Sequence, residues 1–181
     1  MVMTEEEREL FLKTDFDLMV FAAKRKKILP AGITMSEFLE TDPQIKFDCK
    51  RVIYDDPEVI DEYLASNFDH LDKDQVLIIN GFKRKLESQF IILKCLQKHA
   101  IFINLSDEKV YAVSSISDPF DTLFDYFPSI TTTRLIPFKD RIIFDGIFTK
   151  QDIQFGSGIR GSFNTMYIAA KRNKQIIFKL P

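Results

Sequence analysis

Residues 88–116 read SQFIILKCLQKHAIFINLSDEKVYAVSSI, and this stretch decides the character of the C-terminal half of the chain. Three runs rich in β-branched and aromatic residues, 87–96, 100–105 and 110–116, are separated by short polar segments. Such runs are typical of strands, and the polar residues 106–109 predict the loop of a hairpin. The stretch therefore indicates β-structure built from neighbouring segments.

The pattern continues to the C-terminus. The Asp145-Gly146 pair marks a tight turn or a β-bulge. We expect further strands over 131–138, 141–144, 147–148, 153–155 and 176–180, and helices over 119–127 and 158–172. These short strands predict a strongly bent antiparallel sheet or a partly closed barrel with helices at its ends.

The N-terminal half shows helical signals instead. Thr4 and Glu7 form a capping-box pattern, and Thr14 and Asp17 repeat it, so a second helix is expected from Asp15. Further starts are expected near 34, 43, 57 and 72, and Asn80-Gly81 interrupts the last helical pattern. The fold class predicted is α+β. A helical part over residues 1–86 packs on the β-rich part over residues 87–181, as two domains or as one.

Composition excludes several classes of protein. Hydrophobic residues make up 45% and charged residues 29% of the 181 residues, which rules out disordered and fibrous chains. The N-terminal MVMTEEEREL does not resemble a secretory signal, and no apolar run approaches the roughly 18 residues of a membrane span. The two cysteines also favour a reducing compartment. We therefore expect a cytoplasmic protein without membrane contact, and leave oligomerisation open.

Charge is distributed unevenly. Residues 51–75 carry eight acidic and two basic side chains, whereas residues 134–181 carry nine basic and three acidic ones. The basic segment permits an anionic partner. The alternative is that the two segments face each other or are only solvated.

One glycine-rich segment is the first candidate site. Residues 156–161 read GSGIRG, a literal G-x-G-x-x-G between a predicted strand and a predicted helix. A dinucleotide fold also needs an acidic residue further on, and none follows. Exposed N–H groups at a helix start would still suit an anion, while the alternative is a turn that needs glycines for its backbone shape. The anion-binding candidates are Gly156, Ser157, Gly158, Arg160 and Ser162.

The second candidate is a basic surface made of Arg134, Lys139 and Arg141. These residues lie within RLIPFKDRIIFDGIF (134–148), where basic and aromatic residues alternate, as in surfaces that bind single-stranded nucleic acid. The alternative is that the phenylalanines belong to the core and only the charges are outside.

Catalytic and metal chemistry have little support. Cys95 and His99 are four residues apart, so they meet only if the chain turns at Gln97-Lys98. The two cysteines and two histidines have no zinc-type spacing. We predict no catalytic residues, no metal and no cofactor.

Three segments, VYAVSSISDPFDTLF (110–124), TTTRLIPFKDRIIFDGIF (131–148) and DIQFGSGIRGSFNTMYIAAKR (152–172), resemble part of an uncharacterised bacterial protein family. That part reads approximately "VYgVlGl.dp.eel…lLPFkgkIIYDGl…FGgGIRrsln.aY..A", and the likeness begins near Gln89. Arg160 stands where the relatives have arginine, whereas Gly161 replaces their usual basic residue. The zinc tail of some similar proteins is absent, because no cysteine follows Cys95. The resemblance implies a bacterial cytoplasmic α+β protein and transfers no activity.

These observations lead to three hypotheses. The first is a non-enzymatic binding or regulatory module with its site at the Gly156–Arg160 turn and the basic surface. The second is a nucleic-acid-associated protein that uses the same surface. The third is an enzyme acting on a phosphorylated small molecule, which needs a pocket beside Gly158 containing an ionisable group such as Asp145 or Asp152.

Overall fold

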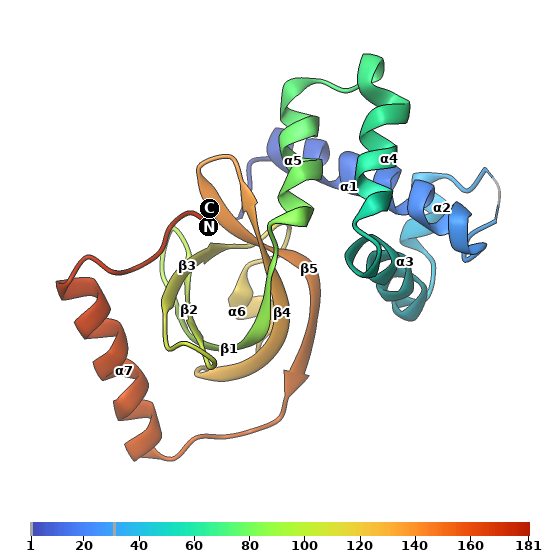
Figure 1. The fold of residues 1–181 in the computed structure, drawn as a ribbon. Coiled ribbons are helices and arrows are strands. Elements are labelled where there is room, and N and C mark those ends of the chain that lie inside the picture. Colours follow the sequence, from blue (N-terminus) through green and yellow to red (C-terminus); the bar gives the residue numbers. More distant parts are fainter. Residues whose placement is uncertain (1, 31) are drawn as a thin grey trace. The chain divides into compact units, whose positions relative to one another are not determined.

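The computed structural model describes residues 2–30 and 32–181 (Figure 1). The chain forms two compact units, which are described separately. The helical unit comprises Glu5–Lys83, and the barrel unit comprises Arg84–Pro181 together with residues 2–4. The α+β class with a helical N-terminal part is confirmed.

The helical unit contains five α-helices and one short 3₁₀ helix within the described residues. They are α1 (Glu5–Lys26), α2 (Met35–Leu39), α3 (Pro43–Asp55), α4 (Glu58–Asn67), η1 (Phe68–His70) and α5 (Lys73–Lys83). Local chemistry explains two of the starts. Thr34 and Glu37 close a capping box before α2, and the Asp42 carboxylate accepts the Gln44 N–H at 2.7 Å before α3.

The expected break at Thr14 is wrong. Thr14 lies inside the continuous helix α1 and is 1% exposed. Its hydroxyl donates to the carbonyl of Leu10 at 2.8 Å, so it does not cap a new helix. Burial of Phe11, Leu18 and Ala22 on one face of α1 favours continuation over the local cap signal. Asn80-Gly81 likewise does not interrupt α5.

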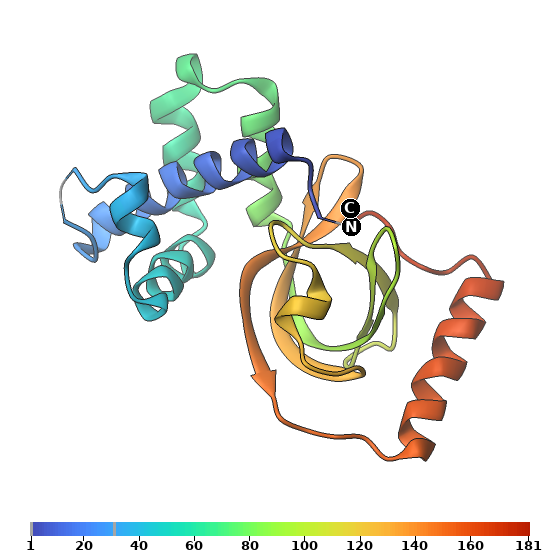
Figure 2. The same cartoon turned by 180° about the vertical axis from the view of Figure 1, so that it is seen from behind.

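The barrel unit is built on five strands. They are β1 (Leu86–Cys95), β2 (Ala100–Asn104), β3 (Val110–Ser114), β4 (Ser129–Phe138) and β5 (Arg141–Gln151). Their hydrogen bonds close a ring in the order β1-β2-β3-β5-β4 (Figure 2). Four pairs are antiparallel, but β3 and β5 pair in parallel, at only two positions. The sheet is therefore mixed and its closure uneven, which corrects the expectation of an antiparallel sheet.

Strand β5 replaces several shorter predicted strands. Gly146, with φ of 85°, lies within β5, and the pairing of β4 with β5 shifts between Thr133 and Leu135. A bulge of this kind bends a strand without ending it. The strand expected over 153–155 is absent from the described residues. The one expected over 176–180 is reduced to Ile177, which bridges to Tyr111 of β3.

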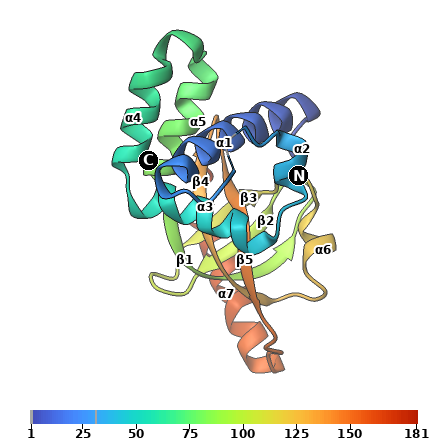
Figure 3. The same ribbon diagram turned by 90° about the vertical axis from the view of Figure 1, so that its right-hand side faces the viewer.

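The barrel unit has apolar clusters on both sides of its sheet. The short helix α6 (Phe120–Leu123) contributes Phe120 to the inner cluster, where it meets Phe102 and Phe144. Helix α7 (Ser157–Arg172) lies along the outside of the ring in Figure 1 and is seen behind the strands in Figure 3. Its Tyr167 joins Ile91 of β1, Ile101 of β2 and Val110 of β3 in the outer cluster. The sheet thus buries residues on both faces, so its strands read as near-continuous apolar runs.

Candidate functional site

The glycine-rich turn lies at the start of α7, and its side chains are exposed. Gly156, Gly158 and Gly161 do not have the positive φ that favours glycine. A methyl group added at any of the three would meet no atom within 4 Å. Neither backbone shape nor crowding within the described structure therefore requires glycine here. Glycine inside a helix costs roughly 0.5–1 kcal/mol relative to alanine, so Gly158 and Gly161 weaken the first turns of α7.

The other candidates of this turn bond to their own backbone. The Arg160 Nε donates to the Phe155 carbonyl at 2.8 Å, and the Ser162 hydroxyl donates to the Gly158 carbonyl at 3.2 Å. No side chain within the described residues caps the helix start at Gly156. The structure thus gathers Gly156, Ser157, Gly158, Arg160 and Ser162 at one open helix start rather than within an enclosed pocket.

The three residues of the predicted basic surface have different surroundings. Arg134 is 9% exposed, and its guanidinium pairs with Glu87 at 2.9 Å and with the buried Asp145 at 3.6 Å. Lys139 and Arg141 lie at the β4–β5 hairpin, where Arg141 pairs with Asp140 at 3.3 Å. Because Arg134 is buried and paired with two carboxylates, it is not part of an open cationic surface. A guanidinium that has lost its water needs such partners.

The ionisable groups predicted beside Gly158 are engaged elsewhere. The Asp145 carboxylate also accepts the Ile147 N–H at 3.0 Å, next to the bulge at Gly146. Asp152 accepts a hydrogen bond from the Tyr126 hydroxyl at 2.8 Å. The structure does not bring either carboxylate together with the glycine-rich turn in one pocket.

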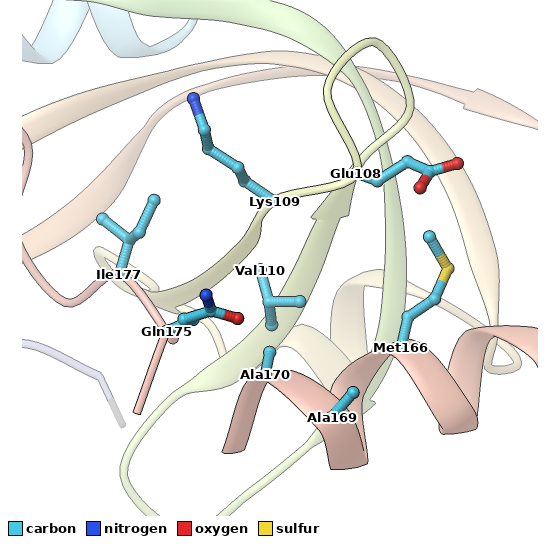
Figure 4. A pocket seen from close by; sticks show the side chains of 8 residues that line it. All are labelled: Glu108, Lys109, Val110, Met166, Ala169, Ala170, Gln175 and Ile177. Carbon is cyan, nitrogen blue, oxygen red and sulfur yellow. The ribbon is translucent and has the colours of Figure 1, made fainter. Parts of the chain in front are cut away.

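A groove that sequence reasoning missed lies beside the C-terminal half of α7 (Figure 4). It has a volume of about 480 Å³, within the usual range for ligand pockets. We call it the α7 groove. It is lined by Glu108, Lys109, Val110, Met166, Ala169, Ala170, Gln175 and Ile177. The small side chains of Ala169 and Ala170 lie on the side of α7 that faces Val110 of β3. The polar residues are Glu108 and Lys109, at the turn between β2 and β3, and Gln175, which follows α7.

The exposed side of α7 is cationic. Arg160, Asn164, Ile168 and Lys171 follow at three- and four-residue intervals and are exposed, as is Arg172. Residues 157–181 contain five lysines and arginines and no acidic residue. We use the name α7 cationic face for Arg160, Lys171 and Arg172 of α7 together with Lys174, which follows the end of the helix. None of these four residues pairs with an acid anywhere in residues 2–30 or 32–181. The run Lys171-Arg172-Asn173-Lys174 was the sequence signal for this face.

The turn needed to bring Cys95 and His99 together is present. The Leu96 N–H donates to the His99 carbonyl at 2.9 Å. Cys95 and His99 both line a pocket of about 330 Å³ at the β1–β2 hairpin. Burial raises the pKa of the Cys95 thiol to about 11 and lowers that of His99. The thiol is therefore protonated at neutral pH and is a poor nucleophile. Among the described residues, no group of three His, Cys, Asp or Glu is arranged to hold a metal ion.

No helix within residues 2–30 and 32–181 is long and apolar enough to cross a membrane. Comparison of the chain with protein-family models, curated proteins and solved structures found no match.

Proposed function

We propose that the protein is a non-enzymatic binding module whose barrel unit holds an anionic partner against α7. The observation that carries this proposal is the α7 cationic face, four cations that form no ion pair with any residue that the structure describes. The α7 groove lies along the same helix and is lined by Glu108 and Lys109 as well as by apolar residues. Unpaired cations attract an anion over about a Debye length, and an apolar groove adds contact area at short range. The partner expected is therefore an anion that also carries an apolar group.

A nucleic acid is the second candidate for this partner. Arg160 and Lys171 are eleven residues apart on the same side of α7, about 17 Å along the helix axis, which suits a run of phosphates. Five-stranded, partly open barrels of the OB type bind oligonucleotides on the face of strands 2 and 3. Here α7 covers the outer side of those strands, so the helix itself would take the place of that face. This likeness is one of architecture and carries no function by itself.

The test is a titration of the full chain against two polyanions, a single-stranded oligothymidylate and poly-glutamate, followed by fluorescence anisotropy. Binding is expected to weaken steeply between about 50 and 200 mM salt. The double variant Lys171→Gln with Arg172→Gln removes two cations and should weaken binding. For the oligonucleotide, the slope of log K against log salt concentration should fall in magnitude by about 1.4, since each phosphate contact to a single strand contributes about 0.7.

The matched control is Lys26→Gln with Lys27→Gln, which removes the same charge from the helical unit. An equal loss in both double variants would show that net charge alone is read, and would contradict the proposed site. Tighter binding of the oligonucleotide than of poly-glutamate favours the nucleic-acid candidate, and the reverse favours an acidic protein partner. Absence of binding to both polyanions overturns the proposal.

The groove is tested separately by Ala169→Leu, which fills it without changing charge. If the groove takes an apolar group of the partner, this variant weakens binding while leaving the salt slope unchanged. An unchanged affinity would limit the site to the α7 cationic face.

A further inference from the structure

A second pocket, of about 360 Å³, lies wholly within the helical unit. One of its walls is a single face of α1, because Lys13, Asp17, Phe21 and Lys24 are spaced by four, four and three residues. The rest of the lining consists of Tyr63 and Asn67 of α4 and of His70, Leu71 and Gln75. We call this the α1 pocket. Its volume suits a small metabolite rather than a large cofactor.

Asp17 stands at the centre of the α1 wall and is half-buried. Its carboxylate has no hydrogen bond or ion pair with any residue that the structure describes. Burial raises the pKa of Asp17, which the nearby Lys13 partly offsets. A carboxylate that has lost part of its hydration without gaining a donor is one that a cationic ligand group would stabilise.

Tyr63 contributes a second polar group. Its ring packs edge-on against Phe21 with centroids 5.2 Å apart, which fixes the position of the hydroxyl. That hydroxyl makes no hydrogen bond within the described part of the chain. Burial, reinforced by the charge of Asp17, raises the pKa of Tyr63 to about 12, so the hydroxyl stays neutral and can donate or accept.

Lys13 and Lys24 flank Asp17 on the same face, and both are exposed at the rim. Neither forms an ion pair within residues 2–30 and 32–181. Asp17 would repel a simple anion, and the two lysines would repel a simple cation. A zwitterion satisfies both signs, with its positive end at Asp17 and its negative end at a lysine. Val20, Phe21 and Leu71 add apolar lining for a side chain.

We infer that the α1 pocket binds a small zwitterion with an apolar side chain, of the kind formed by an apolar α-amino acid. The ligand ammonium lies on Asp17 and within reach of Tyr63, its carboxylate lies on Lys13 or Lys24, and its side chain lies against Phe21 and Leu71. This site is independent of the barrel unit and of the anionic partner proposed for it.

The experiment is an NMR titration of the ¹⁵N-labelled full chain with L-leucine. Two analogues each remove one charge: N-acetyl-L-leucine lacks the ammonium group and isoamylamine lacks the carboxylate. Leucine is expected to shift the amide signals around residues 17, 63 and 75 and to bind at least about tenfold more tightly than either analogue, because each analogue lacks one charge-assisted hydrogen bond.

Variants assign the two charges. Asp17→Asn should remove the preference for leucine over N-acetyl-L-leucine, and Lys13→Met with Lys24→Met should remove the preference over isoamylamine. Tyr63→Phe deletes only the hydroxyl and should weaken leucine binding with little effect on packing. The matched controls Glu6→Gln and Lys26→Met change charge on the same helix outside the pocket, and should leave leucine binding unchanged.

Inorganic phosphate is the comparison for a simple anion site. If phosphate binds more tightly than leucine, or both analogues bind as tightly as leucine, the zwitterion assignment is wrong. If leucine gives no shift in the millimolar range, the α1 pocket is not an amino-acid site. Because these comparisons use the wild-type chain, they hold even if a variant fails to fold.

Discussion

The helical unit and the barrel unit carry opposite charges, yet each buries an ion pair. Residues 5–83 contain 18 acidic and 11 basic side chains, and residues 84–181 contain 9 acidic and 14 basic ones. In the helical unit, the Lys50 ammonium lies 2.5 Å from Asp15, with both side chains almost fully enclosed. In the barrel unit, Arg134 bonds to the buried Asp145 and also to Glu87, whose side chain is 45% exposed.

The two buried ion pairs differ because helices and strands surround them differently. Lys50 and Asp15 join α3 to α1 among packed helices, where the ammonium also lies 4.6 Å from the centre of the Phe82 ring. Arg134 instead crosses from β4 toward both neighbouring strands, β1 and β5, and keeps partial contact with water. The helical unit therefore depends more strongly on its pair.

Each unit also carries one cysteine, which allows the two to be measured separately. Cys49 belongs to the helical unit and is fully buried, and Cys95 belongs to the barrel unit. In single-cysteine variants, thiol labelling in increasing denaturant reports unfolding of the helical unit through the buried Cys49. For the barrel unit the readout is the rise in labelling rate of the partly buried Cys95 above its rate in the folded state.

The largest effect is expected for Lys50→Met. It leaves the Asp15 carboxylate in the core without its ammonium, at a cost of about 3–5 kcal/mol to the helical unit. Labelling of Cys49 in denaturant measures this cost. Replacing both partners, with Asp15→Leu added, should recover most of it. A loss below about 1 kcal/mol for the single variant would contradict the contrast between the two pairs.

A smaller loss is expected for Arg134→Met in the barrel unit. Asp145 keeps its hydrogen bond from the Ile147 N–H, and Glu87 returns to water, so the cost is about 2–3 kcal/mol. Labelling of Cys95 should report it while labelling of Cys49 stays unchanged. The control Arg141→Met removes a half-exposed arginine at the nearby hairpin and should cost little.

Glycine substitutions sharpen the comparison within the barrel unit. Gly158→Ala and Gly161→Ala should each stabilise it by about 0.5–1 kcal/mol, because helical φ and open surroundings accept a methyl group. Gly146→Ala should destabilise it, because φ there is 85°. If the alanine variants stabilise the unit but weaken partner binding, close backbone approach by the partner explains these glycines.

The smallest effect is a pH dependence of the barrel unit. Burial lowers the pKa of His99 below its ordinary 6.5, so the unfolded chain takes up a proton first as pH falls. This contribution to stability is complete above about pH 6.5 and is lost as pH falls through the folded-state pKa. Denaturant midpoints from Cys95 labelling at pH 7.5 and 5.5 measure it. His99→Gln should remove this part of the slope, whereas the control His70→Gln, in the helical unit, should not.

Most element positions could be predicted from the sequence because they depend on local chemistry. The Thr34 and Asp42 caps, the hairpin loop at 106–109 and the helix over 158–172 each have a local cause. The errors fall where tertiary packing overrides a local signal. Thr14 resembles a cap but lies on the buried face of α1. For Asp145-Gly146 the sequence left a tight turn and a β-bulge open, and the pairing of β4 with β5 shows the bulge.

The candidate sites divide in the same way. The basic run at the C-terminal end of α7 was visible in the sequence, but the α7 groove depends on how α7 lies against β3. Arg134 appeared to be a surface cation because charge is usually solvated, and only its neighbours Glu87 and Asp145 show that it is buried. The α1 pocket joins residues far apart in sequence, so no local pattern could reveal it.

By itself, the sequence determined the α+β class, the helical and β-rich halves and the uneven charge, since these follow from periodicity, capping and composition. Only the tertiary structure decided that the strands form a mixed ring, that Arg134 and Asp145 are buried together, and which cations remain unpaired. The physical reason is range. The hydrogen bonds of helix caps and the periodicity of side chains act over a few residues. Ring closure, desolvation and pockets depend on segments that meet only after folding.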